Sequence, residues 1–493
     1  MTQAVPTTLG FETKQLTRNA VVYLLPSLLV SGVSVLLTPV YARALAPDDL
    51  AVVAVANSVT AVLGILLGLS LYGCIPRLSV EYDEKRRRSL FGTLLIVSVI
   101  FPAILVGMGF ILGQAGYLDV FENIRFDPHL KLVLLTSLAG VYRPLVVTVY
   151  IAREEPAKVA ILSVLSAVAQ LALTVLFVVG LNEGAVGVLK ANLLSGAITG
   201  VASIVLLARL SDFHLGLPGL AVALTFSLPL VPHLVANWAL GISDRLILDR
   251  YVPAADLGRY SLAYLFNALV GLVAASVVSA LTPMANRQLK DPSTAANVPR
   301  LGTYALLIII TSALTVALMA KEALALIAPP SYAAAITIVP WVVLGAVFQA
   351  LYFIWAIGTW YSMRTTLVPF ATGLAAIVNI GLNLLLIPRY GVIAAALSTA
   401  AAYAVLAALH GVLAQKLYPI PWEYRRWTWM VVVAIVWYVI GSSFAPQDLT
   451  LAILSKAVLA GVAYPASLVI SGFFTRAELA RARAFVGRWT PVR

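Results

Sequence analysis

The sequence predicts an all-α integral membrane protein with about 14 transmembrane helices, arranged as two parallel six-helix repeats plus two C-terminal helices. Of the 493 residues, 61% are hydrophobic and only 11% are charged, whereas about a quarter of a soluble chain is charged. The apolar residues fall in blocks of about 20, which is the length that crosses a hydrocarbon core of ~30 Å. Two sequence landmarks also recur at a constant separation. These observations exclude a water-soluble enzyme, and the single cysteine, Cys74, excludes a disulfide scaffold.

The apolar blocks define the predicted spans. Blocks this apolar must be helices, because lipid offers no partner for unpaired backbone groups and a β-barrel would show alternating polarity. Charges, prolines and glycines mark the ends of each block. The expected limits are 20–42, 49–72, 89–113, 131–152, 157–180, 186–208, 219–243, 257–284, 301–327, 332–357, 365–387, 391–415, 427–444 and 449–473.

These spans group into segments in chain order. Residues 1–19 are polar and form a short N-terminal segment, and residues 20–210 form the first six-helix bundle. The second six-helix bundle covers 218–417, and two extra helices follow within 427–473. Residues 474–493 form a basic tail. The loops are short, so any function must reside between helices.

A repeated pair of landmarks indicates an internal duplication. Arg43 and Asp49 lie six residues apart after the first span, and Arg250 and Asp256 repeat this pattern 207 residues later. A glycine-led motif before the sixth span, at 184–187, recurs before the twelfth at the same separation. Because six helices is an even number, the two halves share one orientation, as in parallel-repeat transporters with a central cargo site.

The positive charges predict the orientation. With the N-terminus placed in the cytoplasm, the inner segments carry 22 Lys and Arg residues and the outer segments carry 8. Both termini are therefore predicted to be cytoplasmic. The run from Lys85 to Arg88 is a topology determinant that also attracts anionic lipid headgroups. Topology accounts for most of the net charge of +12, so no nucleic-acid partner is expected.

Three cations fall inside predicted spans. Arg143 is the deepest, because it follows Lys131 by 12 residues, or about 18 Å of helix. A cation at that depth costs roughly 2.5–3.5 kcal/mol, so it should face a wet cavity or a partner. Pro144 should kink the helix there, and the alternative is that Arg143 merely bonds the carbonyls this frees. Lys190 and Lys456 lie nearer span ends and are expected to extend to the surface.

The acidic residues lie in loops or near span ends, and Asp244 comes closest to a span centre. A buried carboxylate relay or sodium site is therefore not expected. Asp244 and Arg245 carry paired charges at the outer mouth, with a local ion pair that fastens the helix end as the alternative. The four histidines lack ligand spacing and there is no GxxxxGK[ST] loop. We expect no catalytic residue, metal or cofactor.

Several motifs occur in order along the chain. They are LTPVYARAL at 37–45, GLSLYGCIPR at 68–77, SDRLILDRY at 243–251, LGRYSLAY at 257–264 and NIGLNLLLIPRYG at 379–391. Together they resemble Wzx-type polysaccharide (O-antigen-like) flippases of the MOP exporter superfamily. The resemblance covers roughly residues 13–420.

The resemblance implies two six-helix bundles in a V shape plus two C-terminal helices, in the bacterial inner membrane. Such proteins move undecaprenyl-pyrophosphate-linked oligosaccharide to the periplasmic leaflet for O-antigen, capsule or exopolysaccharide synthesis, beside polymerase machinery and membrane lipids. The cationic cavity of the family would correspond to Arg143, with several mouth positions. The predicted substrate-binding set is Arg143, Arg18, Arg43, Arg77, Lys190, Asp244 and Arg245.

The chemistry of the residues agrees with this reading. Arginine can donate two hydrogen bonds to phosphate oxygens at once, and its electrostatic attraction to a phosphate is stronger in a cavity of low dielectric constant. Translocation needs no covalent step, so the chain is predicted to be a transporter and not an enzyme.

Other functions stay open as alternatives. A lipid II flippase has similar chemistry. A MATE-type cation-coupled drug exporter would need an acidic cavity and a mid-span carboxylate. A polysaccharide polymerase or ligase usually has a large periplasmic loop, whereas the longest loop here covers about 114–130.

Overall fold

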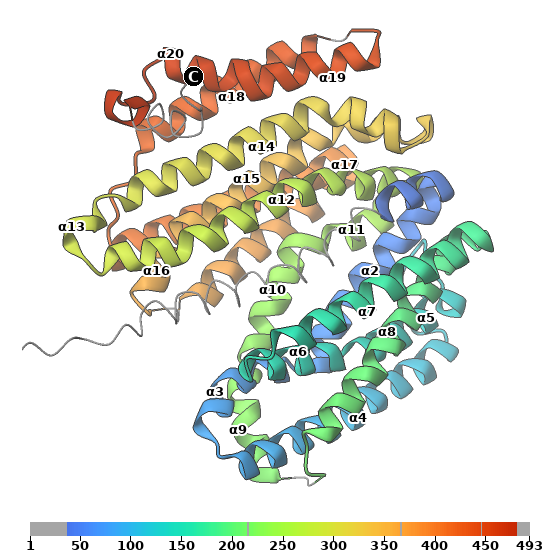
Figure 1. The fold of residues 1–493 in the computed structure, drawn as a ribbon. Helices are drawn as coiled ribbons and strands as arrows, with labels where there is room; N and C mark the ends of the chain where they lie inside the picture. The colour runs from blue at the N-terminus through green and yellow to red at the C-terminus, as the bar shows by residue number, and fades with distance from the viewer. Residues whose placement is uncertain (1–36, 214–215, 365–366, 445, 481–493) are drawn as a thin grey trace, which may run out of the picture. The chain divides into compact units, whose positions relative to one another are not determined.

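A computed structural model describes residues 37–213, 216–364, 367–444 and 446–480 of the chain. These residues form helices and connecting turns, with no strand among them, and hold 12 helices long and apolar enough to cross a membrane (Figure 1). The all-α membrane fold is therefore confirmed. Most of the predicted first span lies outside the described residues, as does Arg18, so the count of 14 spans stays a prediction.

The chain divides into two compact units. Unit 1 comprises Met1–Leu262 together with Asn379–Ala395, and unit 2 comprises Ala263–Val378 together with Ala396–Arg493. Helices α12 (Ala254–Leu289) and α17 (Val368–Leu417) each contribute to both units. The predicted bundle boundaries at 210 and 218 stay a prediction.

Unit 1 is built around α2 (Pro47–Gly68) and α8 (Gly184–Arg209), against which α5 (Lys131–Gly140) packs. A helical stretch at 37–44 precedes α2. The other helices in chain order are η1 (Leu71–Cys74), α3 (Ile75–Glu81), α4 (Glu84–Gln114), η2 (Phe126–Leu130), α6 (Tyr142–Ala152), α7 (Pro156–Thr174), η3 (Val175–Gly180), α9 (Leu217–Ser227), α10 (Leu230–Ile242) and α11 (Asp244–Tyr251).

The repeated landmarks meet inside unit 1. Gly258 approaches the carbonyl of Pro47 so closely that a Cβ would lie 1.8 Å from its oxygen, which makes glycine the residue that fits. Gly184 and Gly391 both have positive φ, at 58° and 60°, a conformation that glycine adopts without a steric penalty. The amide of Ala185, next to Gly184, donates to Asp49 Oδ1 at 3.3 Å. The repeated glycine and aspartate residues therefore have a structural role, because they shape and connect the ends of helices.

Unit 2 centres on α14 (Val298–Ile327), which contacts α15 (Val339–Trp355), α18 (Tyr424–Ser443) and α19 (Leu449–Val458). Helix α17 consists of two helices that meet at the non-helical Gly391. These two parts match the predicted spans 365–387 and 391–415. The Trp427 indole donates to Thr303 Oγ1 at 2.8 Å and so ties α18 to α14. The remaining helices are α13 (Pro292–Ala295), η4 (Pro330–Thr337), α16 (Ile357–Tyr361), η5 (Leu459–Ala463) and α20 (Tyr464–Ile470).

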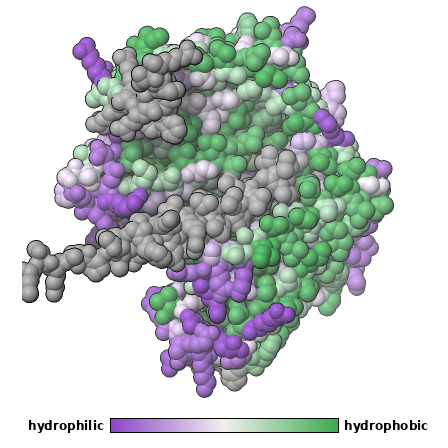
Figure 2. All heavy atoms as spheres, in the orientation of Figure 1, coloured by the Kyte–Doolittle hydropathy of each residue, from purple (hydrophilic) through white to green (hydrophobic). Residues whose placement is uncertain are grey.

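The outer faces of the helices are apolar. Ile161 and Val168 on α7 and Val201 on α8 are 66%, 60% and 61% exposed. Figure 2 shows broad areas of hydrophobic side chains on the face in view, with hydrophilic side chains gathered in patches. In water such a surface would drive aggregation, so these faces are suited to contact lipid tails.

Candidate functional site

Arg143 lies beside a local irregularity in the helical span Phe126–Ala152. Helix α5 ends at Gly140 and α6 begins at Tyr142, so the break falls just before Pro144 as predicted. Pro144 has no backbone N–H group and cannot donate a hydrogen bond to the carbonyl of Gly140, one turn earlier. The loss of this bond explains the irregularity there. Arg143 therefore lies in the first turn of α6, near the middle of the predicted span 131–152.

The guanidinium of Arg143 lacks a partner in the described part of the chain. Its Nε is buried without a hydrogen-bond partner, and no described residue forms a hydrogen bond or ion pair with this side chain. The freed backbone carbonyls thus do not satisfy it. A charge left this way in a membrane-spanning segment requires water or an anionic ligand.

Arg77 and Lys190, in contrast, have acidic partners close in sequence. Arg77 Nε lies 2.7 Å from Glu81 Oε1, and the guanidinium lies 4.8 Å from the Phe226 ring centroid. Lys190 Nζ lies 2.8 Å from Glu183 Oε1, just before α8 begins, as expected for a lysine that reaches toward its helix end. Such exposed pairs contribute at most about 1 kcal/mol, so both cations stay able to exchange partners.

Asp244 and Arg245 form a buried cluster with Tyr260. The Asp244 side chain is only 1% exposed, and its Oδ1 accepts from Arg245 Nη1 at 2.8 Å. The Tyr260 hydroxyl donates to the other carboxylate oxygen. Asp244 thus pairs locally with Arg245 and also connects α11 to α12 through Tyr260. Arg43 lies exposed at the end of the helical stretch 37–44.

One expectation about the intramembrane charges is wrong. Lys456 does not extend to the surface: its side chain is 5% exposed, and Nζ lies 2.6 Å from Oε1 of Glu322, whose side chain is 6% exposed. Glu322 lies near the end of the predicted span 301–327, as the sequence indicated for the acids, but its carboxylate is buried. The pair links α19 to α14 across 134 residues of sequence. No local signal could have predicted it.

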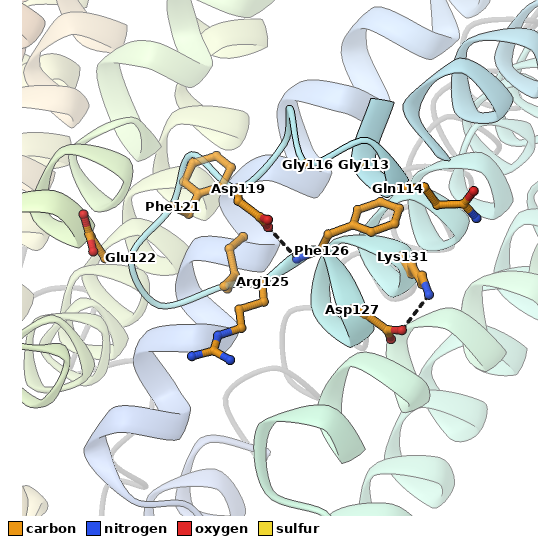
Figure 3. Close-up of a pocket in the computed structure, with 11 residues that line it drawn as sticks. Gly113, Gln114, Gly116, Asp119, Phe121, Glu122, Arg125, Phe126, Asp127 and Lys131 are labelled. Carbon is orange, nitrogen blue, oxygen red and sulfur yellow. Dashed lines mark hydrogen bonds and ion pairs between the residues drawn. The ribbon is translucent and has the colours of Figure 1, made fainter. Parts of the chain in front are cut away.

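A second feature that the sequence did not predict is a cavity of about 720 Å³ in the loop between α4 and α5. In Figure 3 the Phe126 ring lies beside Gly113 and Gln114, the Asp119 carboxylate accepts from the Phe126 amide, and Asp127 pairs with Lys131. None of the six predicted site residues that the structure describes lines this cavity.

Asp249 holds this loop against α11. Its side-chain oxygens accept from the Glu122 amide at 2.8 Å and from the Asn123 amide and Nδ2 at 3.3 and 2.8 Å. Asp249 is 3% exposed. The acids of the motif at 243–251 therefore support structure. Across the described residues, no group of three or more His, Cys, Asp or Glu side chains is placed to hold a metal.

Solved structures share this fold. The lipid II flippase MurJ in an inward closed conformation superposes with a TM-score of 0.73, at 14% identity, over 91% of this chain and 98% of that one. An inward-facing multidrug resistance MATE family transporter of the MOP superfamily gives 0.61, at 14% identity, over 80% and 97%. A mutant MATE transporter from Vibrio cholerae gives 0.55, at 16% identity, over 83% and 98%.

The multi-pass helical fold is therefore shared with a lipid II flippase and with MATE transporters, one of which is described as a member of the MOP superfamily. More particularly, the chain belongs to the polysaccharide biosynthesis protein family, whose sequence profile matches residues 16–288, more than half of its length. A search of curated protein sequences returns no significant match.

Proposed function

We propose that this chain is a flippase that moves undecaprenyl-pyrophosphate-linked oligosaccharide from the cytoplasmic to the periplasmic leaflet of a bacterial inner membrane, by alternating access. Both termini lie in the cytoplasm in this proposal. Membership of the polysaccharide biosynthesis protein family and the MOP fold support it. No bond is made or broken, so the chain acts as a transporter and not as an enzyme.

The observation that carries the proposal is the unpartnered Arg143. A pyrophosphate offers several anionic oxygens, and arginine can bind two of them at once. The described residues leave Arg143 Nε without a hydrogen-bond partner. A pyrophosphate could therefore form a charge-assisted hydrogen bond with Arg143 without first displacing another partner. Arg77 and Lys190, held by exposed and exchangeable pairs, then serve as secondary cations along the path.

Lipid II is the second candidate cargo, because the MurJ structure covers 91% of this chain. A drug exporter is less favoured, since the buried carboxylate Glu322 is already engaged by Lys456.

Headgroup accessibility in inside-out vesicles from cells that lack this chain tests the proposal. Lipid-linked oligosaccharide should accumulate on the cytoplasmic leaflet, and restoring the wild type should reverse this. Accumulation of lipid II in its place would assign the other cargo. Normal sidedness with unpolymerised sugar outside would indicate a polymerase defect and refute flipping.

Variants of Arg143 test the residue itself. Arg143→Ala should lower transport by about one to two orders of magnitude, the loss expected for a hydrogen bond to a charged group of about 1.5–3 kcal/mol. Arg143→Lys should retain part of the activity because it keeps the charge. The control is Arg153→Ala, at the end of the same helix, whose guanidinium already pairs with Glu155 at 3.1 Å. Full transport by Arg143→Ala, with the protein present in the membrane, would make Arg143 a structural residue only.

A further inference from the structure

A chain of neutral polar side chains crosses unit 1 from α2 through α8 to α7. Asn192 Nδ2 on α8 donates to Asn57 Oδ1 on α2 at 3.1 Å, and Gln170 Nε2 on α7 donates to Asn192 Oδ1 at 2.8 Å. The Ser195 hydroxyl donates to Gln170 Oε1 at 2.5 Å, and Gln170 Nε2 also lies 3.3 Å from Thr174 Oγ1. We call these five residues the amide network.

The amide network lies near the middle of the membrane. Asn57 follows the start of α2 by 10 residues, Asn192 follows the start of α8 by 8, and Gln170 precedes the end of η3 by 10. At 1.5 Å per residue these positions are about 12–15 Å from helix ends that are all predicted to lie on the outer side. A hydrocarbon core of ~30 Å has its midplane at that depth. Arg143, also in unit 1, lies at about the same level.

The amide network is exposed at one end and buried at the other. Thr174 and Ser195 are buried, 0% and 5% exposed, whereas Asn57 is exposed. Within the described residues the Asn57 amide accepts one hydrogen bond, and its own NH₂ group donates none. An exposed and unsatisfied amide at mid-membrane is costly against lipid tails. Asn57 is therefore suited to face water or a polar ligand.

The chemistry of the amide network selects the kind of ligand. Its members are neutral and offer both donors and acceptors, whereas a pyrophosphate is best bound by cations and a hard cation by carboxylate oxygens. A sugar hydroxyl is at once a donor and an acceptor, which complements an amide. Gln170 and Ser195 hold the half-buried Asn192 amide, and through it the exposed Asn57 amide, in orientation, so less ordering is needed on binding.

We propose that Asn57 and Asn192 bind hydroxyl groups of the oligosaccharide headgroup while Arg143 binds the pyrophosphate. This inference rests on the proposed function, because it assigns the sugar part of the same cargo. Asn57 and Asn192 are the contact residues, and Gln170 and Ser195 are positioning residues.

The test uses the purified full chain in lipid nanodiscs with two probes. One is undecaprenyl pyrophosphate without sugar, and the other is the lipid-linked oligosaccharide extracted from cells that lack this chain. Asn57→Leu should weaken binding of the oligosaccharide probe about threefold to tenfold, the loss of a neutral hydrogen bond, and leave undecaprenyl pyrophosphate unchanged. Arg143→Ala should weaken both. The control is Thr60→Val, one turn along α2. Among the described residues, the Thr60 hydroxyl bonds only the Ala56 carbonyl.

A second measurement does not depend on the stability of the leucine variant. The native Cys74 is buried at 0% exposure, so an Asn57→Cys substitution provides one accessible thiol for a water-soluble methanethiosulfonate reagent. The oligosaccharide probe should slow its labelling, and undecaprenyl pyrophosphate should not.

The outcomes separate the two levels of the proposal. If the wild type binds neither probe, the proposed function is refuted and this inference falls with it. If the wild type binds both but Asn57→Leu weakens them equally or not at all, and labelling of Asn57→Cys is insensitive to sugar, only the sugar assignment is refuted. The amide network would then be a helix-packing feature, as interhelical amide bonds often are.

Discussion

Removing one member of the buried pair Glu322–Lys456 should destabilise unit 2 strongly, while removing both should not. The pair distance is 2.6 Å, both side chains are about 5% exposed, and Glu322 Oε2 has no hydrogen-bond partner among the described residues. Lys456→Met therefore leaves a carboxylate buried without compensation, at a cost of about 3–5 kcal/mol. Glu322→Gln leaves an ammonium in the same position. The double variant removes both charges and should recover most of the loss.

The assay is the apparent melting temperature of the purified full chain, followed by tryptophan fluorescence. Both single variants should melt clearly below the wild type, and the double variant should melt close to it. Lys321→Met is the matched control, because Lys321 neighbours Glu322 on α14 but is exposed. The reasoning is refuted if the single variants melt like the wild type, or if their losses simply add in the double variant.

Two further predictions concern charges outside the spans. Burial by itself would raise the pKa of Glu478, but hydrogen bonds from Tyr304, Thr475 and Arg426 hold it at about 2, below its usual value of about 4.5. The stabilisation by Glu478 is therefore complete above about pH 4.5 and is lost toward pH 2. The difference in melting temperature between the wild type and Glu478→Gln should decrease over that range. A constant difference would contradict this prediction. Asp249→Ala should release the loop that contains the exposed Arg125 and should therefore increase the rate of tryptic cleavage after Arg125. The Arg250→Ala control should not change this rate. Equal cleavage rates in Asp249→Ala and the wild type would contradict the anchoring role of Asp249.

The positions of the spans could be predicted from the sequence because crossing the membrane is a local requirement. A run of about 20 apolar residues is sufficient for a helix to span lipid, whatever its neighbours are. The expected spans 89–113 and 186–208 accordingly fall inside helices Glu84–Gln114 and Gly184–Arg209. The kink beside Pro144 could be predicted for a similar reason, because a proline affects the helix that contains it whatever the neighbouring helices are. The family could also be recognised, since its motifs are short and contiguous.

What the sequence could not predict depends on contacts between distant segments. Whether Lys456 reaches the surface depends on Glu322, which lies on another helix 134 residues away. The partner of Asp244 is Tyr260, which lies 16 residues away on the next helix and which no local pattern indicated. Asn57 is an ordinary residue in the sequence, and only the packing of α2, α7 and α8 joins it to Asn192 and leaves its amide exposed.

The sequence by itself thus determined that this chain crosses the membrane many times, belongs to the polysaccharide biosynthesis protein family and carries an arginine inside a predicted span. Only the tertiary structure decided which charges are neutralised and which polar groups stay open. The physical reason is that membrane insertion depends on the hydropathy of each segment alone, whereas the partner of a buried charge or amide is set by side-chain packing between helices.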